Sequence, residues 1–427
     1  MNEMEIGGCA ASCRAAHLGI WIAAAFALAM ASAGAWAQAL TFEQLVSQAL
    51  ATHPAVLSKQ SSSLAAKADL QGADWQRYPT PSLEFGNDTR NTRTALFRLQ
   101  QPLWAGGRIS AGIDAAQARF QAADIAIRET KQDVLLRVIA AYVEALRQQA
   151  RREIVAQGVR HHEELLGLIT RRVAAEASPR VDRELAQSRL YQATNDLSTV
   201  NQALANSLTQ LSQLAGRRIE AVAALDSTGL ADPKSRDEAL GQAIAWSPAL
   251  RRLTFEEEAA QAEIELKRAG YKPQVSARLE YGYASAPLNG IPAYTTSRVM
   301  VVVEAQTGAG LSALSAVDAA ISRRDAVRQQ RESAMRDLQE RLFVDWDELL
   351  AARKRLENAL LASRSSKEVY ESYTRQYTAG RKTWLDVLNT VRESTQAEVV
   401  AVDSRAQASG AFLRLQLETG NFTGLIQ

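Results

Sequence analysis

The sequence predicts a mainly α-helical protein with a small β part. It is built from two copies of one unit, in which a helix, a β-hairpin, a long helix and a returning helix follow one another. Three observations lead to this fold class. Motifs recur at a nearly constant spacing, and apolar residues recur every three and four positions over most of the chain. Two short stretches in each half break this helical pattern, and one of them alternates with a period of two.

The first observation is an internal duplication. An alanine five residues before a proline occurs at 49–54 and again at 243–248, a spacing of 194 residues. After an insertion of ten residues the spacing is 204, which aligns Asp182 with Asp386. Such a repeat is far longer than the roughly 20 to 50 residues of a solenoid unit and indicates a duplicated domain half. We expect repeats at 38–216 and 239–420, a linking segment at 217–238 and a tail at 421–427.

Residues 1–37 are expected to be a cleaved signal peptide. An apolar run from Leu18 to Ala31 precedes Ala35-Trp36-Ala37, which supplies the small residues at positions −3 and −1 of a signal-peptidase site. Both cysteines, Cys9 and Cys13, lie before this run. We therefore expect no cysteine in the exported chain.

Composition and motifs exclude several classes of function. The formal net charge is only +2 and no basic block occurs, which argues against a nucleic-acid partner. After the signal no apolar run reaches 18 residues, so no transmembrane helix is expected. His161 and His162 are neighbours on a helix and point about 100° apart, so we interpret them as a solvated face and not as metal ligands. Without a nucleophile–base pair or a dinucleotide fingerprint, we expect no enzyme, no metal and no cofactor.

Long helices occupy most of each half. No proline occurs between Leu103 and Ser178, and apolar or small residues recur there in alternating steps of four and three, as in supercoiled helices. Roughly 65 residues of helix would span about 100 Å. The returning helices keep this period at 193–214 and, with smaller side chains, at 397–418. A plain antiparallel coiled coil is the alternative on periodicity alone.

Each half also carries one β-hairpin at the same place. Residues 275–283 alternate between apolar and polar, which is typical of a strand with one apolar and one polar face. Four strands cannot close a barrel, and open sheet edges are not tolerated in hydrocarbon. Hairpins that enter a membrane therefore need strands from several chains, and a small soluble sheet is the alternative. Strands are expected near 82–88, 94–103, 274–284 and 297–305.

The long helices are expected to reverse at two motifs. In the second, at 377–389, Gly380 should end the helix in a left-handed conformation, and Thr383 with Asp386 should form a capping box for the next helix. In the first, Ser178 is expected to be the N-cap and Pro179 the first helical residue.

A further motif connects strand and helix. Gly106, Gly107 and Arg108 end the string that begins at Gln101, and a glycine pair before a helix can cradle a phosphate. The second half has Gly308-Ala309-Gly310 there, without a following Lys-Ser/Thr pair. We therefore interpret these three residues as a strand-to-helix joint.

Together these motifs resemble one family. The tip Y-T-A-G-x-x-T-x-L-D-V-L at 377–388, the Gln101-to-Arg108 string and the two A-x-x-x-x-P openings look like the TolC family of outer-membrane efflux and type I secretion channels. The resemblance extends over essentially all of 38–420. It implies a homotrimer in which the chains pool four strands each into one β-barrel, in contact with outer-membrane lipid. The barrel would continue as an α-helical barrel through the periplasm.

The resemblance also implies a gate. In the family, acidic residues at the start of the last helix form rings that constrict the periplasmic mouth, and these positions match Asp386 and Asn389. This chain departs from the pattern, because Asn389 stands in place of a second aspartate. A ring of three Asp386 carboxylates would attract cations and raise the pKa of the group. The alternative for Asp386 is a helix-capping carboxylate, and both roles can hold together.

The function implied is an exit duct that passes protein or small-molecule cargo to the outside. An inner-membrane transporter, either an ABC or a proton-driven one, would supply the energy through a periplasmic adaptor. The alternative is a periplasmic coiled-coil adaptor or structural interaction protein, although an adaptor should carry one helical hairpin between the halves of a lipoyl-type β-module. The adaptor-docking residues expected at the helix tips are Ala177, Ser178, Asp182, Gly380, Arg381 and Thr383.

Overall fold

The computed structural model describes most of the 427-residue chain, and the expected signal peptide at 1–37 lies outside the described residues. The expected tail is described only as far as residue 422. The described ranges are 40–87, 92–225, 233–286, 291–305, 309–310 and 312–422.

Both halves follow the same order of elements, so the predicted fold class and its duplication are confirmed. In the first half the elements are α2 (Phe42–Thr52), α3 (Pro54–Trp75), β1 (Thr80–Asn87), β2 (Arg93–Trp104), α4 (Arg108–Ala174) and α5 (Arg180–Ala215). In the second half they are α6 (Arg236–Trp246), α7 (Pro248–Ala269), β3 (Gln274–Ala286), β4 (Ile291–Glu304), α8 (Ser312–Thr378) and α9 (Trp384–Glu418). The equivalent helices α4 and α8 both have 67 residues.

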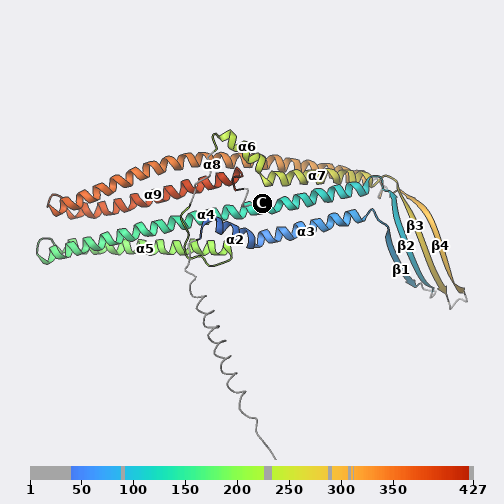
Figure 1. Cartoon of the computed structure of the whole chain (residues 1–427), viewed down its shortest axis with the longest axis horizontal. Helices are drawn as coiled ribbons and strands as arrows, with labels where there is room; N and C mark the ends of the chain where they lie inside the picture. Colours follow the sequence, from blue (N-terminus) through green and yellow to red (C-terminus); the bar gives the residue numbers. More distant parts are fainter. Residues whose placement is uncertain are drawn as a thin grey trace, which may run out of the picture.

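The molecule is elongated, with the strands at one end and the helix reversals at the other (Figure 1). At 1.5 Å per residue, α4 and α8 are each about 100 Å long. The hairpins α4–α5 and α8–α9 extend in the same direction away from the sheet. Helices α3 and α7 lie beside the parts of α4 and α8 that are nearer to the sheet (Figure 1). Helix α4 is central, because α3, α5, α7 and α9 all pack along it.

The first helix of each half is interrupted where a single helix was expected. Pro54 and Pro248 are the first residues of α3 and α7, and a proline cannot donate the backbone hydrogen bond that would continue the preceding helix. His53 Nδ1 accepts a hydrogen bond from the Ala55 N–H at 3.2 Å, and Ser247 Oγ accepts one from the Leu250 N–H at 3.3 Å. The A-x-x-x-x-P motif therefore encodes a helix break. Helix α6 also begins slightly before 239, the expected start of the second repeat.

The main apolar core lies midway along the molecule, where α2 packs against α4 and α5, and the end of α9 contributes to the same cluster. Tyr142 is its largest fully buried side chain, with its ring centroid 5.2 Å from that of Phe42. The Tyr142 hydroxyl donates a hydrogen bond to the Ala223 carbonyl at 2.8 Å, and burial raises the pKa of this tyrosine to about 12. The core thus joins the start of the chain to the middle of the long helix.

A carboxyl group is buried near the end of α9. Glu418 is 7% exposed, and its Oε2 atom has no hydrogen-bond partner. Burial, aided by the charge of Asp345, raises the pKa of Glu418 to about 7, although Arg341 and Arg414 oppose the shift. The apolar stripe of α9 therefore ends in a group that resists ionisation.

Glu418→Gln tests this burial through its pH dependence. The folded chain retains a proton on Glu418 between about pH 4.5 and pH 7 that the unfolded chain has released, so the wild type loses stability as the pH rises through this window. The glutamine variant should be more stable at pH 8 by on the order of 2 kcal/mol and indistinguishable near pH 4. Chemical denaturation at both pH values measures this difference. Glu393→Gln, on the exposed face of α9, is the control, and an equal gain at both pH values would contradict the assignment.

Candidate functional site

The second helix reversal has the predicted capping geometry. Gly380 has φ 70°, and the Arg381 N–H donates to the Gln376 carbonyl at 2.8 Å. Asp386 Oδ2 accepts hydrogen bonds from the Thr383 N–H at 3.1 Å and the Thr383 hydroxyl at 2.8 Å, while the Asp386 N–H donates to Thr383 Oγ1 at 3.2 Å. The two bonds that the carboxylate accepts, first the one from the Thr383 hydroxyl and then the one from its N–H, favour the ionised form and lower the pKa of Asp386.

Asp386 and Asn389 lie on one side of α9. They are three residues apart, which places them on the same helix face, and both are partly exposed. Val387 and Leu388, between them in the sequence, are buried in the tip of the bundle. The structure therefore holds a fixed carboxylate and an amide at the first turns of this helix.

The first reversal differs from its expectation. Helix α5 begins at Arg180, and its N-cap is Pro179, which makes no side-chain capping bond. The prediction of Ser178 as N-cap was therefore wrong by one position, because the proline occupies the place that Thr383 holds in the second repeat. Glu176 has φ 57°, a conformation that favours glycine, and it stands at the repeat position of Gly380.

The two reversals are packed together in a small apolar core. Tyr377 and Trp384, on either side of the second reversal, have ring centroids 5.4 Å apart and are both buried. The Arg172 guanidinium of α4 lies 5.1 Å from the centroid of the Tyr377 ring.

Of the expected docking residues, Ala177, Gly380, Arg381 and Thr383 are exposed, and Ser178 and Asp182 are partly exposed.

His162 is not on a solvated face. Its side chain is 7% exposed, and burial together with the nearby Arg189 and His161 lowers its pKa. His161 lies with its ring centroid 5.2 Å from that of Tyr370. The expectation of a solvated pair is therefore wrong for His162, because this face of α4 is covered by other helices.

Glycines form the joint between β2 and α4. Gly106 has φ 60° and Gly107 has φ 92°, and Gly107 is the N-cap residue of α4, which starts at Arg108. A Cβ atom on Gly106 would lie 2.7 Å from Lys272 Cβ. Gly310, at the same repeat position, has φ 62°. Both strand-to-helix connections thus use a left-handed glycine.

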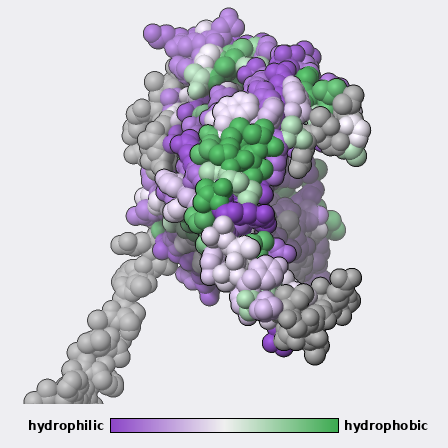
Figure 2. All heavy atoms as spheres, turned by 90° about the vertical axis from the view of Figure 1, so that its right-hand side faces the viewer, coloured by the Kyte–Doolittle hydropathy of each residue, from purple (hydrophilic) through white to green (hydrophobic). Residues whose placement is uncertain are grey.

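The four strands form one antiparallel sheet in the order β1-β2-β3-β4, in which the β2–β3 pairing joins the two repeats. Strand β4 starts six residues before the expected position 297. One face of the sheet is apolar and exposed, and Val299 on it is 79% exposed. Figure 2 looks at this end of the molecule and shows hydrophobic side chains open to the surface. The large apolar residues of this face are Leu83, Phe85, Phe97, Leu279, Tyr281, Tyr283, Val299, Val301 and Val303.

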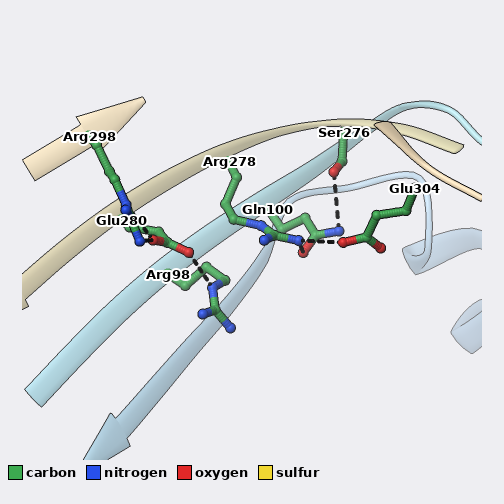
Figure 3. Close-up of polar contacts among 7 residues, drawn as sticks. All are labelled: Arg98, Gln100, Ser276, Arg278, Glu280, Arg298 and Glu304. Carbon is green, nitrogen blue, oxygen red and sulfur yellow. Dashed lines mark hydrogen bonds and ion pairs between the residues drawn. The ribbon is translucent and has the colours of Figure 1, made fainter. Parts of the chain in front are cut away.

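The opposite face carries a polar network (Figure 3). Glu280 is 4% exposed and accepts hydrogen bonds from Arg98 Nε at 2.9 Å and Arg298 Nε at 2.8 Å. Arg278 bonds at 3.3 Å to both Gln100 and Glu304. Because these residues come from β2, β3 and β4, the network ties the strands of both repeats together.

The described residues contain neither a membrane-crossing helix nor a metal cluster. No helix among them combines the length and the apolar character that a membrane span needs. Nor do three or more histidine, aspartate or glutamate side chains gather there in a way that could hold a metal ion.

Comparison with known proteins agrees with this geometry. A protein-family model described as "Outer membrane efflux protein" matches residues 45–217 and 239–421, one segment in each repeat. No curated protein sequence matches the chain significantly.

Solved structures share the fold at low sequence identity. A structure of CusC, described in connection with transmembrane channel formation, has a TM-score of 0.77 at 16% identity and covers 88% of this chain and 91% of its own. A membrane protein from Pseudomonas aeruginosa has a TM-score of 0.77 at 18% identity, with coverages of 89% and 93%. The outer membrane protein VceC from Vibrio cholerae has a TM-score of 0.76 at 16% identity, with coverages of 89% and 96%.

Gly106→Ala tests the strand-to-helix joint. The substitution adds a Cβ atom at a left-handed residue and against Lys272, so it should destabilise the chain by about 1–2 kcal/mol. Gly72→Ala in α3 is the matched control, because nothing lies within 4 Å of the added atom, and alanine favours a helix by up to about 1 kcal/mol. Thermal unfolding of the two variants should shift in opposite directions. A shift of the same sign in both variants would show that the joint does not require a glycine at position 106.

Proposed function

Because the chain belongs to the outer membrane efflux protein family, we propose that it is the exit duct of a tripartite export system. The protein is an outer-membrane channel and not an enzyme. In the proposed system it passes protein or small-molecule cargo to the outside. An inner-membrane transporter, ABC or proton-driven, supplies the energy, and a periplasmic adaptor connects the two.

The observation that carries this proposal is the two-faced sheet with open edges. Strands β3 and β4, with 13 and 14 residues, exceed the roughly 9–11 residues that a tilted strand needs to cross a bilayer. The outer edges of β1 and β4 have no partner strand among the described residues. In hydrocarbon each unpaired backbone group costs several kcal/mol, so a single chain cannot remain in the membrane alone.

A homotrimer satisfies both edges. In a four-stranded antiparallel meander β1 and β4 run in opposite directions, so β4 of one copy can pair antiparallel with β1 of the next. Three copies supply twelve strands and close the barrel. The apolar face that contains Val299, here called the Val299 face, points toward lipid, and the polar face that contains Glu280 points toward the lumen. The helices then extend about 100 Å from the barrel into the periplasm.

The helix tips would form the periplasmic mouth. Three copies of α9 bring three Asp386 carboxylates and three Asn389 amides around one axis, and the ring of charge would restrict passage. Two influences on the pKa of Asp386 then oppose one another, because the Thr383 bonds lower it and neighbouring carboxylates raise it.

The exposed Ala177, Gly380 and Arg381 are proposed adaptor contacts, together with Ser178, Asp182 and Thr383.

The alternative, a periplasmic adaptor or structural interaction protein, fits the sheet less well. A water-soluble protein would leave the Val299 face exposed to solvent, and apolar patches of that kind are rare on soluble monomers. Cell fractionation separates the two functions. Recovery from the outer membrane as a heat-modifiable trimer supports the duct, whereas recovery from the soluble periplasm supports the adaptor.

Val299→Asp and Met300→Asp test the assignment of the two sheet faces. The two positions are adjacent in β4 but point to opposite faces, and Met300 lies opposite Arg278 on the polar face. A carboxylate at 299 would enter lipid, and we expect a trimer yield reduced at least about tenfold, which corresponds to 1.4 kcal/mol. The aspartate at 300 should assemble normally. Quantitative heat-modifiability gels on outer membranes measure both yields. A loss of trimer in Met300→Asp alone would reverse the orientation of the two faces, and equal yields would contradict the assignment of the Val299 face to lipid.

Asp386→Ala combined with Asn389→Ala tests the gate. Removing the ring should raise single-channel conductance in planar bilayers. Because Asp386 also caps α9, Thr383→Ala is the control, since it removes the two capping bonds made by the Thr383 hydroxyl and keeps the carboxylate. The gate predicts a conductance rise in the double variant that exceeds the rise in Thr383→Ala. Equal effects would assign Asp386 to capping alone, and an unchanged conductance would remove both residues as the constriction.

A further inference from the structure

A cavity of about 310 Å³ lies among α4, α5 and α9, between the middle of the molecule and the helix tips. Two apolar clusters are built from the same helices. Val155, Val200 and Val399, which themselves line the cavity, form the first, and the tip core around Leu165 and Val391 is the second. Apart from these valines, most of the residues that line the cavity are polar or charged.

Cationic side chains dominate this wall. Arg151 from α4, Arg189 from α5 and Arg392 from α9 all line the cavity, and Asp196 is the one carboxylate that does. Arg151 has a carboxylate partner, Asp403, at 3.6 Å. In the described part of the chain, neither Arg189 nor Arg392 forms an ion pair, although Arg189 donates to the Gln192 side chain at 2.9 Å. Two guanidinium groups on separate helices therefore share one cavity without an acidic partner.

His162 adds a second and independent observation. Its ring lines the same cavity and is 93% buried, since only 7% of the residue is exposed, yet its Nδ1 atom has no hydrogen-bond partner. Buried polar atoms in native proteins nearly always have a partner. Both charged groups that act on His162, Arg189 and His161, are basic. The basic surroundings of the ring therefore favour an anion close to it.

We propose that this cavity binds a small tetrahedral oxyanion, such as sulfate or inorganic phosphate, between Arg189 and Arg392, with His162 in its wall. Guanidinium groups bind such oxyanions through paired, charge-assisted N–H···O bonds. Thr395 and Gln192, which also line the cavity, offer hydroxyl and amide donors for the remaining oxygens.

The bound anion ties the two helical hairpins together. Arg189 belongs to the α4–α5 hairpin and Arg392 to the α8–α9 hairpin. Without the anion these two cations repel each other across the cavity, and with it they are attracted to a common partner. The site thus stabilises one arrangement of the hairpins. It does not depend on the proposed transport function, because binding is a property of the folded chain.

Isothermal titration of the full-length protein in detergent with sodium sulfate tests the site. Sodium chloride at the same ionic strength controls for general salt effects. We expect saturable binding of one sulfate per chain, weakened at least about tenfold in Arg189→Gln and in Arg392→Gln. Arg183→Gln on α5 and Arg405→Gln on α9, which do not line the cavity, should bind like the wild type. Phosphate should compete with sulfate.

Hydrogen exchange tests the coupling of the hairpins in the same samples. Sulfate should slow exchange in the first turns of α9 and the facing turns of α5, but not in the Arg392→Gln variant. Absence of saturable binding to the wild type, or equal binding by Arg189→Gln, Arg392→Gln and the controls, would overturn the site. Binding without any change in exchange would overturn the link between the hairpins.

Discussion

The pairing of β2 with β3 is the interaction on which the rest of the structure depends, because it joins the two repeats. A two-stranded hairpin on its own is marginally stable, and two separate hairpins would leave four open edges. The β2–β3 ladder merges them into one sheet, and Glu280 reinforces it by binding an arginine on each neighbouring strand. Since α4 and α8 both leave this sheet at the same end, the ladder also sets the parallel course of the two long hairpins.

The two repeats have the same backbone conformation at their reversals, although their side chains differ there. At both reversals the same backbone hydrogen bond closes the long helix, from Ala177 to Arg172 and from Arg381 to Gln376. The second reversal uses glycine in the left-handed position, whereas the first places Glu176 there. The two reversals therefore have the same backbone geometry, although only the second has a glycine where the left-handed conformation is required.

Periodicity predicted the long helices and one of the strands. The 3.5-residue repeat identified the long helices, and the alternation at 275–283 identified β3, because both patterns follow from which side chains face a neighbour. The start of β4 was missed, since Thr295 and Thr296 extend the ladder without an apolar–polar alternation. The breaks at His53 and Ser247 were missed as well, although Pro54 and Pro248 were visible.

For the candidate site, local chemistry was predictable and tertiary packing was not. Thr383 and Asp386 are three residues apart, so their capping box could be read from the sequence. The burial of His162 depends on α5 and α9, which are distant in the sequence, so no local pattern around the residue predicts it. The left-handed backbone conformation of Glu176 could not be predicted either, because the hairpin imposes it and the side chain does not favour it.

The unpaired edges of β1 and β4 have a consequence for how the protein reaches its final state. A chain with two open edges can pair with any exposed strand, including the wrong one, until its proper neighbours arrive. In the proposed trimer the stability of the sheet therefore depends on the concentration of chains, and the interval between synthesis and assembly is the period in which aggregation competes with folding.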